Sequence, residues 1–190
     1  MKIKNRSELI SIIRQQDWLM EALRDVRSLE LPDWYIAAGA VRNTVWNYLH
    51  SFPTTFNQND VDVIYFDQSD MNGEREGISE KSLKEKNPKL KWEVVNQARV
   101  HLFNNRPNIG HPPVKSSGKS IAYWSETPTC VGIRLEASDA ITICAPYGLN
   151  DLMDLIVKPI PKPYQNLVLY QQRVKSKNWA ECWPNLKIIH

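Results

Sequence analysis

The sequence predicts a single domain of the α/β or α+β class. Its 190 residues, 42% of them hydrophobic, suffice to bury one core but leave little room for two full domains. Helical and strand-like spacings of apolar residues both occur along the chain. The segment 60–66 is apolar on both faces after its first three residues, which is typical of a central strand.

The N-terminal part is predicted to form a helix, a strand, a tight turn and a second helix. Behind Ser7, a candidate N-cap, apolar residues recur at helical spacing, so a helix is expected over 7–29. After a break that contains a proline, a short strand is expected over 34–38. Gly39-Ala40 then forms the turn that leads into a helix over 41–49.

The rest of the chain is predicted from the same signals, and one loop is rich in proline and glycine. The predicted elements are a loop 51–59, the central strand 60–66, a charge-rich helix 67–88, a strand 91–95, a helix 96–103, a loop 104–120, hairpin strands 129–135 and 140–145, a helix 149–157, a stiff linker 158–163 and a basic helix 167–179.

Composition excludes several classes of protein. The excess of Lys and Arg (24) over Asp and Glu (21) gives a net charge of +3, too small to indicate nucleic-acid binding by itself. No run is apolar enough for a membrane span or a signal peptide, so a cytoplasmic protein is expected. Three cysteines without CxxC spacing favour neither disulfides nor zinc. The seven tryptophans favour core packing, with base stacking as the alternative.

The turn at Gly39-Ala40 is the first candidate for chemistry. Glycine lets a ligand approach the backbone, and the N-terminus of the following helix presents free N–H groups to an anion. Arg42, in the first helical turn, could add a charged fork for phosphate. The alternative is a strand–helix turn that merely requires glycine.

Asp60 and Asp62 are the second candidate. Side chains two residues apart on a strand share a face, so both carboxylates are expected on the same side of the sheet. Such a pair is costly at the start of an apolar strand unless a cation lies between them. Mg²⁺ with a nucleoside triphosphate fits, in a one-metal or two-metal arrangement. A solvated strand end is the alternative.

Together these residues resemble a known signature. Ala38-Gly39-Ala40-Val41-Arg42-Asn43 followed by Asp60-Val61-Asp62-Val63 resembles the motif of the polymerase-beta-like nucleotidyltransferase superfamily, and its turn is similar to that of the tRNA CCA-adding and poly(A) polymerase group. Over roughly residues 7–186 the chain also resembles a bacterial family of stand-alone nucleotidyltransferase-like proteins. Ala40 stands where Gly or Ser is usual, and Asn43 where the CCA-type turn has Asp.

The resemblance implies a mixed β-sheet flanked by helices, in one domain over 1–190 with its core at about 30–157 and a C-terminal helical extension at about 164–190. It implies Mg²⁺-dependent transfer of a nucleoside monophosphate from an NTP to an unidentified acceptor, whether a small molecule, RNA or a protein. Asp60 and Asp62 would be catalytic metal ligands. Gly39, Ala40, Arg42 and Asn43 would form the nucleotide-binding turn.

Glu93 is the best candidate for a third catalytic carboxylate, because it lies in the middle of the strand 91–95. A strand-edge Glu paired with Lys is the alternative, and Glu126 and Asp139 are weaker candidates for the role. Two other functions stay open. One is a non-catalytic nucleotide-binding or interaction module on the same fold. The other is an RNA-contacting protein that uses the basic helix containing Arg173, Lys175 and Lys177.

Overall fold

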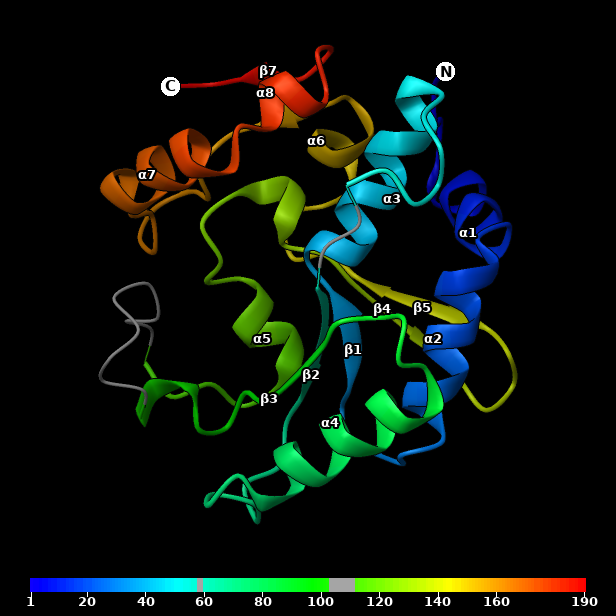
Figure 1. The fold of residues 1–190 in the computed structure, drawn as a ribbon. Coiled ribbons are helices and arrows are strands. Elements are labelled where there is room, and N and C mark those ends of the chain that lie inside the picture. The colour runs from blue at the N-terminus through cyan, green and yellow to red at the C-terminus, as the bar shows by residue number, and fades with distance from the viewer. Residues whose placement is uncertain (58–59, 103–111) are drawn as a thin grey trace.

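A five-stranded mixed sheet forms the centre of the computed structural model, which describes residues 1–57, 60–102 and 112–190 (Figure 1). The strand order is β3-β2-β1-β4-β5; β2 and β3 are parallel and the other neighbours are antiparallel. This sheet and its flanking helices confirm the predicted fold class. The strands are β1 (Tyr35–Ala37), β2 (Val61–Tyr65), β3 (Trp92–Asn96), β4 (Gly132–Leu135) and β5 (Ile141–Cys144).

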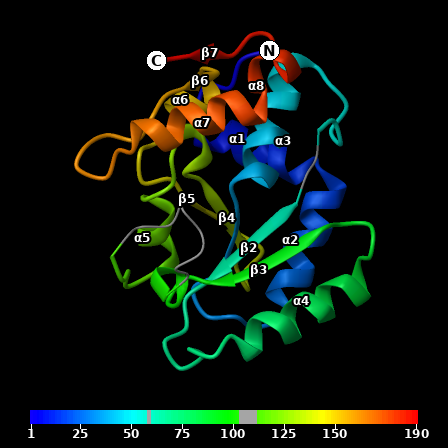
Figure 2. The same cartoon turned by 60° about the vertical axis from the view of Figure 1, so that its left-hand side comes forward.

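Helices cover the sheet on both faces. Ile36 and Val63 pack into the large core on the side of α2 (Asp17–Arg27), while Ile64 packs with Ile121 of α5 (Ser117–Ile121) on the other side. Figure 2 shows the sheet between these two helices. Because side chains alternate along a strand, Asp62 shares the face of Ile64 and α5.

The predicted helix over 7–29 is two helices, α1 (Arg6–Arg14) and α2. The N-cap of α1 is Asn5 rather than Ser7: its side chain accepts a hydrogen bond from the backbone N–H of Glu8. The chain breaks at Gln16, which has extended backbone angles and a buried side chain that donates to the carbonyl of Ile12. Apolar residues keep the same spacing on both sides of this break, so periodicity alone does not reveal it.

The strand-to-helix turn has no intervening loop. The helix α3 (Gly39–His50) begins two residues after β1 ends, and Ala38 between them has φ 50° and ψ −119°. A non-glycine residue avoids this region because its Cβ crowds the backbone. The amide of Ala38 donates to the carbonyl of Val131, which ties the turn to the segment before β4.

Two other predicted helices are wrong in extent. Over 96–103 the chain continues β3 to Asn96 and then forms only a 3₁₀ turn, η1 (Val100–Leu102). Over 149–157 the helix α6 (Asn150–Met153) ends early, because Leu155 takes a positive φ of 59° before the short strand β6 (Ile156–Val157). The charge-rich helix predicted over 67–88 is α4 (Glu74–Lys86). Of the loop predicted over 104–120, residues 104–111 lie outside the described residues.

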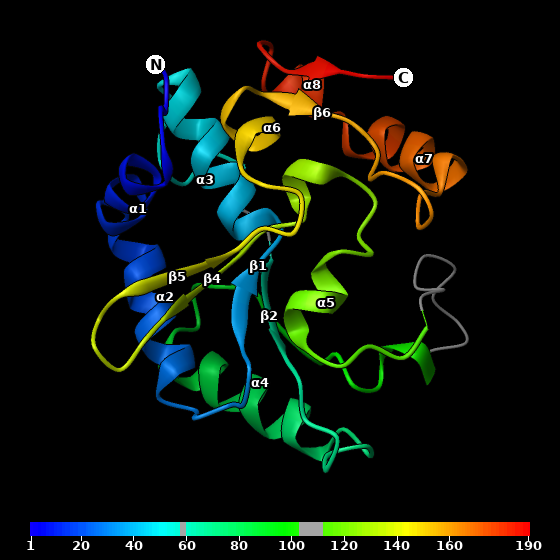
Figure 3. The same ribbon diagram turned by 180° about the vertical axis from the view of Figure 1, so that it is seen from behind.

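The C-terminal segment returns to the end of the molecule that holds α3. Helices α7 (Leu167–Lys177) and α8 (Trp179–Cys182) lead to β7 (Lys187–Ile188), which pairs with β6 in a second, parallel sheet. Figure 3 shows this segment from behind, at the end opposite α4. No helix among the described residues is both long and apolar enough to span a bilayer. The three cysteines are free thiols.

Replacing Ala38 by glycine is expected to raise the free energy of unfolding by about 1 kcal/mol. Glycine relieves the positive φ, and this gain exceeds the entropy that glycine adds to the unfolded chain. Urea denaturation measures the change. The matched control Ala40→Gly, inside α3, should lower the stability by about 1 kcal/mol. A loss of stability in Ala38→Gly would show that the turn is not strained.

Candidate active site

Asp62 lies at the point where the sheet meets the turn. In the strand register it is opposite Ala37, the last residue of β1, and opposite Glu93 on its other side. Neighbouring strands are about 4.8 Å apart. The two predicted acids therefore lie side by side on one face, next to the turn that begins α3.

Asp60 lies just before β2 and is exposed to solvent. It is two residues from Asp62, and its charge contributes to the electrostatics of that carboxylate. Burial and the neighbouring Glu93 raise the pKa of Asp62 to about 6, with a smaller contribution from Asp60. The positive charges of Arg42 and Lys177 act in the opposite direction. The site therefore concentrates negative charge, which the charges of Arg42 and Lys177 partly offset.

The unusual backbone conformation of the turn falls on Ala38 and not on Gly39, which is already the first residue of α3. A Cβ on Gly39 would be 3.8 Å from Nη2 of Arg42, an ordinary contact. Ala40 is buried, and its carbonyl accepts a hydrogen bond from the hydroxyl of Thr44.

Arg42 is buried, with only 5% of its surface exposed. Its guanidinium donates to Thr129 Oγ1 (2.8 Å) and to Asn43 Oδ1 (3.0 Å). It lies over the rings of Trp46 and Trp179, 5.1 and 4.8 Å from their centroids. Its Nε is buried and has no hydrogen-bond partner among the described residues. Burial lowers the pKa of Arg42 to about 10, so the group remains a cation at neutral pH.

Asn43 connects the turn to the loop that precedes β2. Its side-chain amide donates to the carbonyl of Asn57 (2.9 Å), and its oxygen accepts from Arg42. Asn43 therefore links the two predicted motifs through the described part of that loop. Direct contact of Gly39, Ala40, Arg42 or Asn43 with a nucleotide stays a prediction.

The weaker candidates for a third acid are both held in ion pairs. Glu126 is fully buried and pairs with Arg173 of α7. Asp139 pairs with Arg27 (2.7 Å) in the loop between β4 and β5. Because Gly132, at the start of β4, is the residue opposite Ala37, this loop lies at the far end of the strand from Asp62. The register thus favours Glu93 as the neighbour of Asp62.

Sequence reasoning did not connect Thr129, Arg173 or Trp179 with this site. Glu126 pairs with Arg173, Trp179 contacts Arg42, and the guanidinium of Arg173 lies 6.0 Å from the Trp179 ring centroid. These residues lie far from Arg42 in the chain, so no local pattern connects them. The only local signal was the basic character of the helix at 167–179.

The acids offer suitable donors for a hard divalent cation. Among residues 1–57, 60–102 and 112–190, no three His, Cys, Asp or Glu side chains are grouped closely enough to hold a metal by themselves. Mg²⁺, however, takes one or two protein carboxylates and completes its shell with phosphates and water. Burial and the neighbouring acids raise the pKa of Asp62, and a bound cation would lower it. The donor set therefore fits Mg²⁺ that binds together with a nucleotide.

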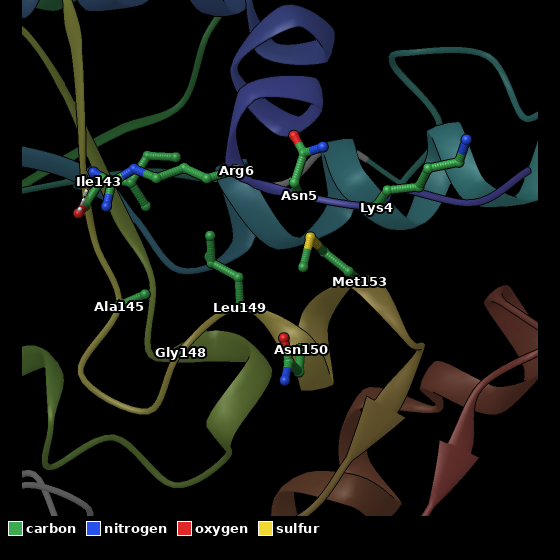
Figure 4. Close-up of a pocket in the computed structure, with 9 residues that line it drawn as sticks. All are labelled: Lys4, Asn5, Arg6, Ile143, Ala145, Gly148, Leu149, Asn150 and Met153. Atoms are coloured by element: carbon green, nitrogen blue, oxygen red, sulfur yellow. Dashed lines mark hydrogen bonds between the residues drawn. The ribbon is translucent and has the colours of Figure 1, made fainter.

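Two surface hollows are found among the described residues. One, of about 350 Å³, separates the N-terminal segment from α6 and is lined by Lys4, Arg6, Leu149 and Asn150 among others (Figure 4). A second, of about 420 Å³, lies between α4 and β3, where Glu93 is one of its lining residues. Neither is lined by Asp60, Asp62 or Gly39.

Comparisons with known proteins are consistent with this geometry. A family model described as nucleotidyltransferase matches residues 24–188. A solved structure, described as revealing a CCA-adding enzyme head domain, has a TM-score of 0.85 and 34% sequence identity; the match covers 99% of this chain and 97% of that one. The comparison with curated proteins gave no match.

Larger enzymes share the fold. A tRNA-processing enzyme in its apo form has a TM-score of 0.54 and 18% identity; the match covers 100% of this chain and 46% of that one. The Thermotoga maritima CCA-adding enzyme in complex with tRNA has a TM-score of 0.57 and 12% identity, over 100% of this chain and 43% of that one. The chain thus spans less than half of each.

Replacing Asp62 by asparagine should stabilise the metal-free protein at pH 7.5 by on the order of 2 kcal/mol. The pKa of Asp62 is raised to about 6, so the folded state binds its proton more tightly than the unfolded state does. Wild-type stability therefore falls as pH rises from about 4 to 6, and Asp62→Asn removes this fall. Urea denaturation at pH 4 and pH 7.5 tests it. A variant less stable than wild type at pH 7.5 would contradict it.

Replacing Arg42 by alanine should lower the free energy of unfolding by about 3 kcal/mol. The substitution removes a buried cation that lies against two indole rings, and it leaves a cavity and unpaired polar neighbours. Thermal and urea denaturation measure the change, with exposed Arg24→Ala in α2 as the matched control. Equal stability of the two variants would show that Arg42 has no structural role.

Proposed function

Because the chain belongs to the nucleotidyltransferase family, whose model matches residues 24–188, we propose that it transfers a nucleoside monophosphate from an NTP to an acceptor in a Mg²⁺-dependent reaction. The observation that supports this most directly is the position of Asp62. Its carboxylate is partly buried, with Glu93 opposite it in the register and the turn that begins α3 next to it.

In the proposed reaction Asp60 and Asp62 would hold Mg²⁺, which when bound would supply charge neutralisation and orientation of the triphosphate. The backbone N–H groups of Gly39 and Ala40, at the positive end of α3, face the phosphates. Asn43 holds the turn against the loop before β2, and the charge of Arg42 adds to the positive potential there.

The chemical step is an exchange of one phosphorus–oxygen bond for another. The acceptor oxygen bonds to the α-phosphorus, the bond to pyrophosphate breaks, and the proton of the acceptor hydroxyl passes to a carboxylate. Glu93 is the residue proposed for this proton, because it lies beside Asp62 on the same face.

RNA is one proposed class of acceptor. The solved structure similar over almost the whole chain is described as a CCA-adding enzyme head domain, and another relative by fold was solved with tRNA. Small molecules and proteins are the other classes, and the fraction that becomes labelled distinguishes them from RNA.

Incubation with each α-labelled NTP and Mg²⁺, in the presence of fractionated RNA, protein or small molecules, should label one fraction. Asp60→Asn and Asp62→Asn should each reduce labelling on the order of a hundredfold or more, because the charge that holds the cation is lost. Asp139→Asn is the matched control, since Asp139 is an exposed acid at the far end of β4. Chelation of the metal should also abolish labelling.

Binding of an NTP without transfer to any fraction would favour the non-catalytic nucleotide-binding module. Salt-sensitive RNA binding without nucleotide binding would favour the RNA-contacting protein. Labelling that is equally strong in the wild type and both acidic-site variants would exclude this site as the catalytic one.

A further inference from the structure

Two contacts fix the C-terminal helices against the start of α3. Arg173 of α7 pairs with Glu126, which is fully buried. Trp179 of α8 is buried and lies against the guanidinium of Arg42, 4.8 Å from ring centroid to Cζ. The end of α7 is therefore held beside the first turn of α3, although this segment was predicted only as an extension.

In the sequence, Lys177 lies between Arg173 and Trp179, the two residues that make these contacts. It follows Arg173 by four residues, so both side chains leave α7 on the same face, the face that meets Glu126. Asn178, with φ 50°, ends the helix immediately afterwards and directs the chain to Trp179. Lys177 is exposed, and none of the described acids forms an ion pair with it.

The end of α7 also lies near the acids. Trp179, two residues after Lys177, contacts Arg42 in the first turn of α3, and α3 begins two residues after Ala37, the residue opposite Asp62 in the sheet. The two cations differ in availability: Arg42 is buried and already donates to Thr129 and Asn43, whereas Lys177 is open to solvent. Of these two cations, Lys177 is therefore the one that an incoming anion can reach.

We propose that Lys177 contacts the phosphates of the nucleotide bound at Asp62, so that α7 forms one wall of the nucleotide site. A triphosphate carries more negative charge than one divalent cation neutralises. A lysine on a flexible stem suits this task because its point charge can follow the phosphates. This inference rests on the proposed function and adds a residue to the same site.

The test compares two lysines on opposite sides of one helix. Lys177→Gln and Lys175→Gln remove the same charge, but Lys175 lies two residues away and leaves the helix on the other face. Titration calorimetry with each non-hydrolysable NTP and Mg²⁺ should show a Kd about tenfold higher for Lys177→Gln and within about twofold of wild type for Lys175→Gln. Lys177→Arg should recover most of the affinity. Both lysines are exposed, so neither variant should change the unfolding transition.

Equal Kd values for wild type and Lys177→Gln would overturn the inference and leave the proposed function standing. Equal losses for Lys175→Gln and Lys177→Gln would overturn it as well, because the effect would then be general surface charge. Failure of the wild type to bind any of the four NTPs with Mg²⁺ would overturn the proposed function, and this inference with it.

Discussion

The buried charge of Arg42 is the constraint on which one end of this molecule depends. A guanidinium loses its hydration when it is buried, and the protein must replace that hydration with polar and aromatic partners. Those partners come from α3 itself, from η2 (Thr127–Thr129) and from α8. The convergence of these segments on the first turn of α3 follows from this requirement.

The acids and the cations occupy adjacent but distinct places. Asp62 and Glu93 lie on the sheet, in neighbouring strands, whereas Arg42, Arg173 and Lys177 belong to the helices at the edge of that sheet. A ligand that carries both a divalent cation and phosphate groups is complementary to this arrangement. Its cation matches the acids, and its phosphates match the basic side chains. In the free protein, burial and then the neighbouring charge of Glu93 raise the pKa of Asp62.

The local features of the site could be predicted from the sequence. The strand that contains Asp62 and the turn at Gly39-Ala40 are local patterns. The two-residue period of a strand predicts Asp60 on the side of Asp62, but Asp60 lies just before β2, and this part stays a prediction. Prediction missed the exact residue of the turn, because Ala38 takes the positive φ that glycine usually supplies. It also missed the break at Gln16, where the apolar spacing continues unchanged across two helices.

The surroundings of Arg42 could not be predicted by the same means. Thr129 is 87 residues away from it in sequence, and nothing in the pattern around either residue specifies that they meet. Trp179 and Arg173 lie near Arg42 only because of packing over long separations in the sequence. Within its own segment, each of these residues has the pattern of an ordinary core or ion-pair residue.

The contact between the indole N–H of Trp183 and Asn47 Oδ1 (2.8 Å) spans 136 residues of chain. A ribosome releases the N-terminal part of a domain first, so α3 leaves the tunnel long before α8 exists. Until then the first turn of α3 has no aromatic cover from the C-terminal side, and its guanidinium stays in contact with water. The proposed nucleotide site is consequently completed only after α8 has left the ribosome, and a chain that stops before α7 has the acids without the helix that we propose as a wall of that site.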